Sequence, residues 1–148
     1  MLVVIAEKEE LKLVEELGYG DFPILITGAG GINVIQTLKN LPKDTEILNI
    51  GYCGSNHYKI GEKLMISSVC TQRSIAIIKE KKLKCKFHKH YKTTTCYTST
   101  DFVVDTNKVI PCVFDMELAF IRAMFDNVMS IKVVSDNLNY KEFKENQK

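Results

Sequence analysis

Short apolar runs alternate with amphipathic stretches along the first third of the chain. Residues 2–6, 23–27 and 46–50 are largely apolar runs of strand length. The segments between them, residues 11–17 and 32–38, repeat apolar positions every three or four residues, as a helix with one buried face does. The order strand, helix, strand, helix, strand is typical of a parallel sheet with right-handed crossovers, so an α/β fold is predicted.

The middle of the chain has a strand-like pattern with few helix signals. Residues 63–69, 74–78 and 93–98 are rich in residue types that favour strands. Over residues 82–90, lysine or histidine alternates with apolar positions, Phe87 among them. This alternation predicts a half-buried strand, and the row of lysines suits the edge of a sheet because it discourages pairing with another chain.

The last third returns to the α/β pattern. Helical spacing joins four apolar residues on one predicted face: Phe114, Leu118, Ile121 and Phe125. A buried strand is predicted over residues 128–134, followed by an acidic turn at Ser135 and Asp136. The whole chain, residues 1–148, is therefore predicted to form a single domain, a three-layer α/β fold in which helices flank a mixed, largely parallel central sheet.

Composition limits the possible functions without choosing one. The 148 residues suffice for one domain with a real core, and 45% hydrophobic with 26% charged residues is ordinary for a globular protein. A net charge of +2 is too small to indicate nucleic-acid binding. No apolar run is long enough to predict a membrane span, and the N-terminus turns acidic at once, unlike a signal peptide. The five cysteines are scattered without CxxC spacing, which favours reduced thiols and a cytoplasmic location.

A segment rich in histidine and lysine raises two further possibilities, a metal site and a face that binds phosphate or RNA. His88 and His90 share one face of the predicted strand, but Cys85 points to the other, and no second cluster completes a ligand set. The lysines over residues 79–92 have few interleaved aromatic residues for stacking. A solvated edge is favoured in both cases, and no metal or cofactor is predicted.

Two glycine-rich segments follow the second and third predicted strands. Residues 27–33 read TGAGGIN and residues 49–56 read NIGYCGSN, at the strand ends where open α/β sheets bind ligands. They indicate one crevice between two turns, and tight turns without a ligand remain an alternative. A dinucleotide site is disfavoured, because Asn33 stands where the Rossmann fingerprint has its third glycine and the next strand ends without an acidic residue.

Two carboxylates are the sharper candidates for chemistry. Glu117 lies at the entrance of the predicted helix, close to Asp115, and Asp136 follows the last predicted strand. Both have apolar neighbours in the sequence, and an ionised group among apolar side chains is costly unless it is used or paired. Partial burial would raise the pKa of such a carboxyl group toward the range that is useful for a general acid.

Four segments carry a family resemblance when they are taken in order. They are VVIAEKEELKLV near the N-terminus, ITGAGGIN, NIGYCGS followed by KIGEKLMIS, and DMELAFI with KVVSDN. These segments resemble the nucleoside phosphorylases and nucleosidases that cleave purine ribosides, and are most similar to the 5′-methylthioadenosine/S-adenosylhomocysteine nucleosidases. The resemblance implies a fold of the nucleoside phosphorylase type, a purine nucleoside as the small-molecule partner, and a homodimer.

The resemblance also implies three catalytic roles. Asp136 would be the general acid that protonates or hydrogen-bonds N7 of the purine as the glycosidic bond breaks. Glu117 would bind the ribose hydroxyls, and Glu10 would orient the attacking water. These roles agree with the chemistry, because negative groups near the ribose and an acid at the leaving base both favour an oxocarbenium-like transition state. Asp115 is then left as a helix-entry residue, stabilised by the dipole of the helix N-terminus.

A set of substrate-binding residues follows from the same resemblance. Phe102 would stack near the base, Val103 would offer its backbone to the purine edge, and Met116 would pack against the sugar. The full set is Met116, Phe102, Val103, Cys53, Gly54, Ser135 and Gly28. Within it, Cys53 and Gly54 would line the base pocket and Ser135 would help to set Asp136.

One departure from the family pattern bears on the reaction. Phosphorylases of this family hold phosphate with an arginine and a serine around the third strand, where this chain has Asn49 and Tyr52. A phosphate dianion without such donors binds poorly, so hydrolysis is favoured over phosphorolysis. The alternatives left open are a phosphorolytic purine nucleoside phosphorylase and a non-catalytic nucleoside- or nucleotide-binding protein on the same scaffold.

Overall fold

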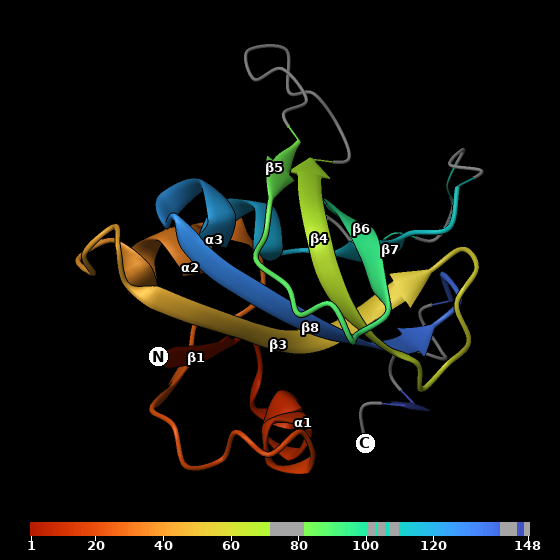
Figure 1. Cartoon of the computed structure of the whole chain (residues 1–148), viewed down its shortest axis with the longest axis horizontal. Coiled ribbons are helices and arrows are strands. Elements are labelled where there is room, and N and C mark those ends of the chain that lie inside the picture. The colour runs from red at the N-terminus through yellow and green to blue at the C-terminus, as the bar shows by residue number, and fades with distance from the viewer. Residues whose placement is uncertain (72–81, 101–102, 104–105, 107–109, 140–144, 147–148) are drawn as a thin grey trace.

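The computed structural model describes residues 1–71, 82–100, 103, 106, 110–139 and 145–146, which form a mixed α/β fold (Figure 1). The strands are β1 (Leu2–Ile5), β2 (Ile24–Ile26), β3 (Glu46–Ser55), β4 (Lys63–Thr71), β5 (Leu83–Lys84), β6 (Thr93–Thr98), β7 (Val113–Asp115) and β8 (Asn127–Asp136). The helices are the 3₁₀ turn η1 (Lys8–Glu10), α1 (Leu11–Glu16), α2 (Gly31–Leu38) and α3 (Leu118–Met124). None of these described helices is long and apolar enough to cross a membrane.

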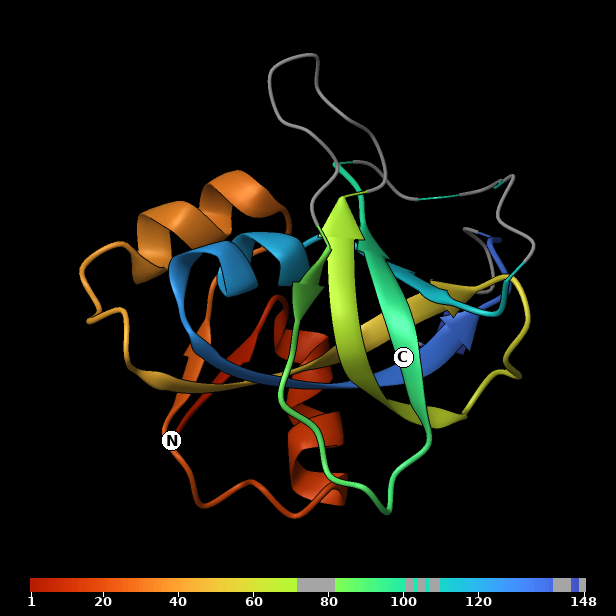
Figure 2. The ribbon, with the colours of Figure 1, turned by 45° about the horizontal axis from the view of Figure 1, so that its top comes forward.

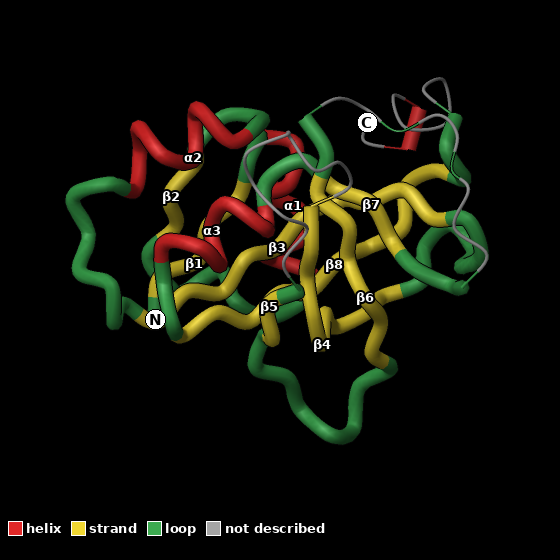
Figure 3. Tube along the Cα trace, turned by 90° about the horizontal axis from the view of Figure 1, so that it is seen from above, coloured by secondary structure: helices red, strands yellow, loops and turns green. Residues whose placement is uncertain are grey.

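The N-terminal half follows the predicted alternation of strands and helices. Strand β1 pairs with β2 and β3, and β3 pairs with β8, all in parallel, so that Val4 lies opposite Leu25 and Asn49. Helix α1 lies on one side of this sheet, and helices α2 and α3 lie side by side on the other (Figures 1 and 3). Two hydrophobic cores result, one between α1 and the sheet and one between the sheet and the α2–α3 pair. The helices thus flank the sheet on both faces.

Five strands close into a ring that the sequence did not predict. Strand β3 pairs with β7, β7 with β6, β6 with β4, β4 with β8, and β8 again with β3 (Figure 2). The β3–β7 and β4–β8 pairs are antiparallel, which makes the sheet mixed. Closure leaves β2 and β5 as the edges among the described strands, and both are short, which limits pairing with other chains.

Strand β3 replaces the second predicted turn. It is 10 residues long and continues to Ser55, so most of the NIGYCGSN segment belongs to the ladder with β8. Strand β8 likewise continues to Asp136, so the acidic turn expected there is the end of a strand. The prediction of a turn at NIGYCGSN was wrong because glycine inside a strand also marks a place where another group approaches the backbone closely.

Helix α3 begins later than its apolar spacing indicated. Phe114, predicted on the buried helical face, lies in β7, while Leu118 and Ile121 are buried on α3 as expected. The Asp115 carboxylate accepts a 2.8 Å hydrogen bond from the amide of Leu118. This bond satisfies an amide that would otherwise lack a partner in the first turn, so the helix starts after Asp115.

The predicted edge strand over residues 82–90 is mostly irregular. Only β5 is a strand in this segment, and it does lie at an edge of the sheet. Phe87 is 48% exposed rather than buried, because the chain leaves the sheet after the bridge between Lys86 and Met129. Ile26 in β2 is 44% exposed because β2 lies at the other edge of the sheet. The strand predicted over residues 74–78 lies outside the described residues.

Candidate active site

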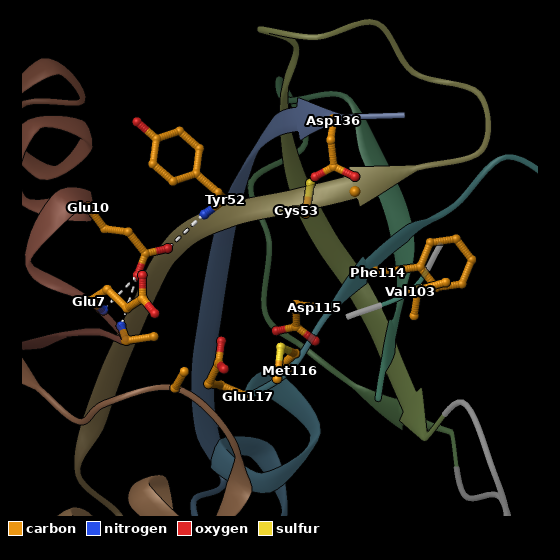
Figure 4. A pocket seen from close by; sticks show the side chains of 13 residues that line it. Glu7, Glu10, Tyr52, Cys53, Val103, Phe114, Asp115, Met116, Glu117 and Asp136 are labelled. Atoms are coloured by element: carbon orange, nitrogen blue, oxygen red, sulfur yellow. Dashed lines mark hydrogen bonds between the residues drawn. The ribbon is translucent and has the colours of Figure 1, made fainter. Parts of the chain in front are cut away.

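One pocket gathers residues from six separate parts of the chain (Figure 4). Its empty volume is about 570 Å³, which includes the solvent in its open mouth. Its wall is built by η1 and the residues before it, the turn before α2, the middle of β3, Val103 between β6 and β7, the junction between β7 and α3, and the end of β8. The lining residues are Ala6, Glu7, Glu10, Ala29, Tyr52, Cys53, Gly54, Val103, Phe114, Asp115, Met116, Glu117 and Asp136.

Glu10 is fixed in this pocket by three backbone amides. Its Oε1 atom accepts hydrogen bonds from the amides of Ala6 (2.9 Å) and Glu7 (3.1 Å). Its Oε2 atom accepts a 2.8 Å bond from the amide of Tyr52 in β3. Burial raises the pKa of the Glu10 carboxyl group, although the charge of Lys132 and these hydrogen bonds act in the opposite direction. The carboxylate therefore has one orientation, set by two elements that are distant in sequence.

Two glycines in β3 make room for two carboxylates. A Cβ atom at Gly51 would lie 2.6 Å from Glu10 Oε2, which is too close for any real side chain. A Cβ atom at Gly54 would lie 2.9 Å from Asp136 Oδ2. The glycines of NIGYCGS are thus explained by the close approach of acidic side chains to the strand.

Glu117 enters the pocket from the start of α3. Its Oε2 atom accepts a 2.8 Å hydrogen bond from the amide of Gly30, which directly precedes α2. Glu117 is half-buried as a residue, but its carboxyl group is enclosed by protein and lies near other acids. Burial, together with the charge of Asp115, raises the pKa of Glu117 to about 8. The first glycine-rich turn, with φ of +87° at Gly28 and +88° at Gly30, therefore presents a backbone amide to a carboxylate.

A buried ion pair lies next to Glu117. The Nζ atom of Lys132 is 3.0 Å from Asp115 Oδ2, and each side chain is only 1% exposed. Burial alone would raise the pKa of Asp115, but Lys132 and hydrogen bonds from Thr98 and Leu118 outweigh it and lower that pKa. Burial also opposes the charge of Lys132, and Asp115 outweighs this effect and raises the pKa of the lysine. Both members of the pair are therefore charged near neutral pH.

The sequence pattern alone did not predict this ion pair. The available signal was a lysine inside the apolar strand sequence IKVV, because a lysine in a buried strand requires a partner. Asp115 does lie at the entry of α3 as predicted, since it accepts the amide of Leu118. Its charge, however, is balanced by Lys132, which the helix dipole alone would not achieve.

Asp136 lies at the opposite end of the pocket from Glu10 (Figure 4). The residue is 0% exposed and ends strand β8. Its Oδ2 atom accepts a 2.9 Å hydrogen bond from the amide of Leu138, and its Oδ1 atom lies 3.1 Å from the hydroxyl of Ser135. Leu138 has a φ of 68°, a conformation that is uncommon for a residue with a side chain and turns the backbone after Asp136.

The predicted substrate-binding residues fall into three groups. Those that line the pocket are Cys53, Gly54, Val103 and Met116. Ser135 and Gly28 lie next to lining residues, Ser135 against Asp136 and Gly28 directly before Ala29. Phe102 lies outside the described residues.

Three larger side chains of the wall were absent from the predicted set: Glu7, Tyr52 and Phe114. The Phe114 ring packs against Tyr97 with 6.0 Å between centroids. The spacing of Phe114 from Leu118 and Ile121 predicted a helical position, whereas Phe114 lies in β7. Tyr52 follows Gly51 in β3, and its ring lies 5.8 Å from the ammonium of Lys12. If the second glycine-rich segment is taken as a strand, Tyr52 is predicted beside the glycines at which other groups approach the backbone.

The wall of the pocket is acidic. Its carboxyl groups belong to Glu7, Glu10, Asp115, Glu117 and Asp136. None of the described lining residues is a lysine or an arginine. Such a wall has no donor cation for a phosphate dianion, whose recognition in proteins relies on arginine, lysine or a cluster of amides.

The side chain of Asn49 is used inside the sheet. It is 2% exposed, and its amide donates a 3.2 Å hydrogen bond to the carbonyl of Val4 in β1. Its Oδ1 atom accepts a 2.9 Å bond from the hydroxyl of Ser130 in β8. The side chain therefore joins three strands and does not line the pocket.

Comparison with known proteins identifies the fold through solved structures. No protein-family model and no curated protein matches the sequence. An MTAN structure from Chlamydia trachomatis matches with a TM-score of 0.80 at 17% identity, covering 99% of this chain and 88% of the other. A structure of the 5′-methylthioadenosine/S-adenosyl homocysteine nucleosidase (MTAN) of Helicobacter pylori matches with a TM-score of 0.77 at 14% identity, covering 97% and 89%. A futalosine hydrolase mutant of Helicobacter pylori gives 0.76 at 13% identity, covering 97% and 90%.

These similarities show that the chain has a nucleoside phosphorylase-like fold, shared with nucleosidases over nearly its whole length. The predicted fold class is thus confirmed as mixed α/β with a mixed sheet. The expectation of a sheet with helices on both faces also holds, with the addition that part of the sheet closes into a ring.

Proposed function

We propose that this protein hydrolyses the N-glycosidic bond of a purine nucleoside or thionucleoside and releases the base and the sugar. One observation carries the proposal: Glu10, Glu117 and Asp136, which are far apart in sequence, line a single pocket of about 570 Å³. Structures of the same fold include an MTAN of Chlamydia trachomatis bound to adenine and one bound to MTA. These ligands support a purine nucleoside as the substrate class.

Asp136 is the proposed acid for the leaving base. As the bond between C1′ of the ribose and N9 of the purine breaks, its electron pair moves into the base, and Asp136 protonates or hydrogen-bonds N7. The side chain suits this role because it is 0% exposed and both of its oxygens have local contacts, with Leu138 and Ser135. A fixed carboxyl group needs little reorganisation as charge develops on the base.

Glu10 is the proposed group that orients the attacking water. Its three amide donors leave further lone-pair positions on the carboxylate for a water molecule. The oxygen of that water forms the new bond to C1′, and its surplus proton balances the proton delivered to the base. Glu10 lies across the pocket from Asp136 (Figure 4), so the water and the leaving base occupy different sides of the sugar.

Glu117 is the proposed ribose-binding carboxylate, with Met116 against the sugar. Its oxygens can accept hydrogen bonds from vicinal hydroxyls, and in its ionised form the carboxylate stabilises the positive charge that develops on the ribose. The amide of Gly30 holds one of these oxygens in place. The ion pair between Lys132 and Asp115 keeps the neighbouring aspartate charged, and Lys132 is not itself a lining residue.

Hydrolysis is favoured over phosphorolysis by the charge of the described wall. A phosphate nucleophile would have to enter among several carboxyl groups without lysine or arginine on the described lining. A water molecule carries no such penalty. Asn49 offers no help to phosphate, because its amide is engaged with Val4 and Ser130.

The test is base release without phosphate. The purified protein is incubated with adenosine or with 5′-methylthioadenosine in phosphate-free buffer, and free adenine and free reducing sugar are measured by chromatography and a sugar assay. We expect equimolar adenine and sugar, at a rate that added phosphate does not raise.

Two outcomes would contradict the proposal. Turnover that strictly requires phosphate and yields a sugar phosphate would identify a phosphorylase. Saturable nucleoside binding by calorimetry, with no base release at any pH between about 5 and 9, would identify a non-catalytic binding protein.

A further inference from the structure

One carboxylate in the pocket has no part in the proposed reaction. Glu10, Glu117 and Asp136 have proposed catalytic roles, and Asp115 is neutralised by Lys132. Among the described lining residues, Glu7 is the remaining acidic one.

The backbone of Glu7 is anchored on both sides. Its amide donates a 3.1 Å hydrogen bond to Glu10 Oε1, and its carbonyl accepts a 3.0 Å bond from the amide of Glu10. Glu7 is half-buried, whereas the next two residues, Lys8 and Glu9, are exposed and do not line the pocket. Figure 4 shows the Glu7 carboxylate turned toward the interior of the pocket, beside that of Glu10. The backbone at Glu7 is therefore held by contacts with Glu10, and its side chain faces the pocket from this fixed position.

The location of Glu7 matches one end of a bound nucleoside. The proposed base-binding groups, Asp136 and Cys53, lie on one side of the pocket, and Glu7 lies on the other (Figure 4). In a nucleoside the base and the 5′ carbon leave the ribose ring at opposite ends. A nucleoside with its base at Asp136 and its hydroxyls at Glu117 therefore directs its 5′ substituent toward Glu7.

The chemistry of Glu7 selects among 5′ substituents. A carboxylate accepts hydrogen bonds and attracts cations, it gives a thioether no partner, and it repels a phosphate. A thioether placed there would also leave the carboxylate partly desolvated without compensation. The neighbouring Glu10 adds to the negative potential at this end, and Lys12, whose ammonium lies over the ring of Tyr52, is not among the lining residues.

We propose that Glu7 determines specificity at the 5′ position and selects nucleosides whose 5′ group donates hydrogen bonds, a hydroxyl or an ammonium, over those with an alkylthio or a phosphate group. This inference rests on the proposed nucleosidase function and narrows its substrate class. Glu7 contacts the substrate at a position remote from the bond that breaks, so its effect lies in the choice of substrate.

The test compares four adenine nucleosides that differ only at the 5′ position: adenosine, 5′-amino-5′-deoxyadenosine, 5′-methylthioadenosine and adenosine 5′-monophosphate. Values of kcat/KM are measured for the natural chain, Glu7→Gln and Glu7→Met. The matched control is Glu9→Gln, because Glu9 is an exposed residue of the same 3₁₀ turn that does not line the pocket.

We expect the natural chain to prefer the amino and hydroxyl nucleosides and to leave the monophosphate uncleaved. The ratio of kcat/KM for the amino nucleoside over the methylthio nucleoside should fall about tenfold or more in Glu7→Gln, because a charge-assisted hydrogen bond is lost. It should fall further in Glu7→Met, which supplies an apolar wall, and stay unchanged in Glu9→Gln. A natural chain that prefers the methylthio nucleoside, or a ratio that Glu7→Met leaves within about twofold, would overturn the inference.

Binding measurements separate this inference from the proposed reaction. Dissociation constants for the same four compounds are obtained by calorimetry. If nothing is cleaved but the amino and hydroxyl nucleosides bind more tightly in a Glu7-dependent way, the hydrolase proposal fails and the specificity proposal stands. If nucleosides are cleaved but substitution of Glu7 does not change the choice of substrate, the hydrolase proposal stands and the specificity proposal fails. If the protein neither binds nor cleaves these compounds, both proposals fail.

Discussion

The ammonium of Lys132 and the carboxylate of Asp115 form an ion pair of 3.0 Å between two side chains that are each 1% exposed. Lys132 lies in β8 and Asp115 at the end of β7, so the pair joins two strands of the closed ring. Asp115 also accepts the amide of Leu118 at the start of α3. One carboxylate therefore links the ring to the helix that presents Glu117.

Removal of the lysine charge should destabilise the protein strongly. Lys132→Met leaves Asp115 buried without its counter-ion, which typically costs about 3–5 kcal/mol in the free energy of unfolding. Asp115→Asn leaves Lys132 buried without its counter-ion in the same way. The double variant should lose less free energy of unfolding than the sum of the losses in the two single variants. Urea denaturation of the three variants at neutral pH measures these costs.

The exposed pair between Lys43 and Asp126 provides the matched control. Its atoms are 3.9 Å apart, and the side chains are 73% and 67% exposed. Lys43→Met should cost under about 0.5 kcal/mol, because water screens such pairs. Equal losses in the free energy of unfolding for Lys43→Met and Lys132→Met would contradict the claim that burial makes the Lys132–Asp115 pair important for stability.

Asp136→Asn should abolish most of the proposed activity while leaving the fold intact. Asparagine keeps the shape of the side chain and one acceptor oxygen but supplies no acid, so kcat for base release should fall by at least about 100-fold. The comparison is with Asp126→Asn, a surface change, in the same assay, with thermal melting of both variants as the check on folding. A loss below about fivefold in Asp136→Asn would remove Asp136 from the proposed mechanism.

Gly51→Ala should disturb Glu10 and thereby the attacking water. The added Cβ would lie 2.6 Å from Glu10 Oε2, and the carboxylate cannot yield easily because three amides hold it. We expect a loss of about 1–3 kcal/mol in stability together with reduced kcat.

Gly20→Ala controls for the substitution itself. A Cβ at Gly20 would also meet a carboxylate at 2.7 Å, but Glu15 is exposed and can move aside. Unfolding curves and kcat are measured for both variants. If Gly20→Ala and Gly51→Ala change stability and kcat by equal amounts, close contact with Glu10 is not the reason for glycine at position 51.

The raised pKa of Glu117 predicts a loss of stability in alkaline solution. The folded protein holds the Glu117 proton up to a pKa of about 8, whereas the unfolded chain releases it at the ordinary, lower pKa. The resulting stabilisation is complete below the unfolded value and is lost as pH rises through the folded value. Asp115, with its lowered pKa, contributes in the opposite sense, and its contribution is lost only in acid.

Glu117→Gln removes this titration and serves as the comparison. Between about pH 5 and pH 9 the free energy of unfolding of the natural chain should fall by on the order of 1–3 kcal/mol more than that of the variant. Denaturant unfolding across this range measures both. Parallel stability profiles for the two proteins would contradict an elevated Glu117 pKa.

Local pattern predicted the elements that bury one face against the sheet. The apolar runs at β1 and β2 and the helical spacing in α1 and α2 gave these four elements nearly in place. The glycines of β3 were predicted to form a turn. A glycine suits a turn, but it equally suits a strand position where another side chain approaches the backbone closely. In β3 the deciding neighbours are Glu10, 41 positions before Gly51, and Asp136, 82 positions after Gly54.

The sequence by itself determined an α/β chain with acidic residues at the ends of its elements. The resemblance of four segments to purine nucleosidases added proposed roles for Glu10, Glu117 and Asp136. Only the tertiary structure decided that these carboxylates share one pocket, that β3, β4, β6, β7 and β8 close into a ring, and that Lys132 neutralises Asp115. The physical reason is range: backbone propensity and side-chain periodicity act over a few residues, whereas desolvation and charge pairing depend on groups that only folding brings together.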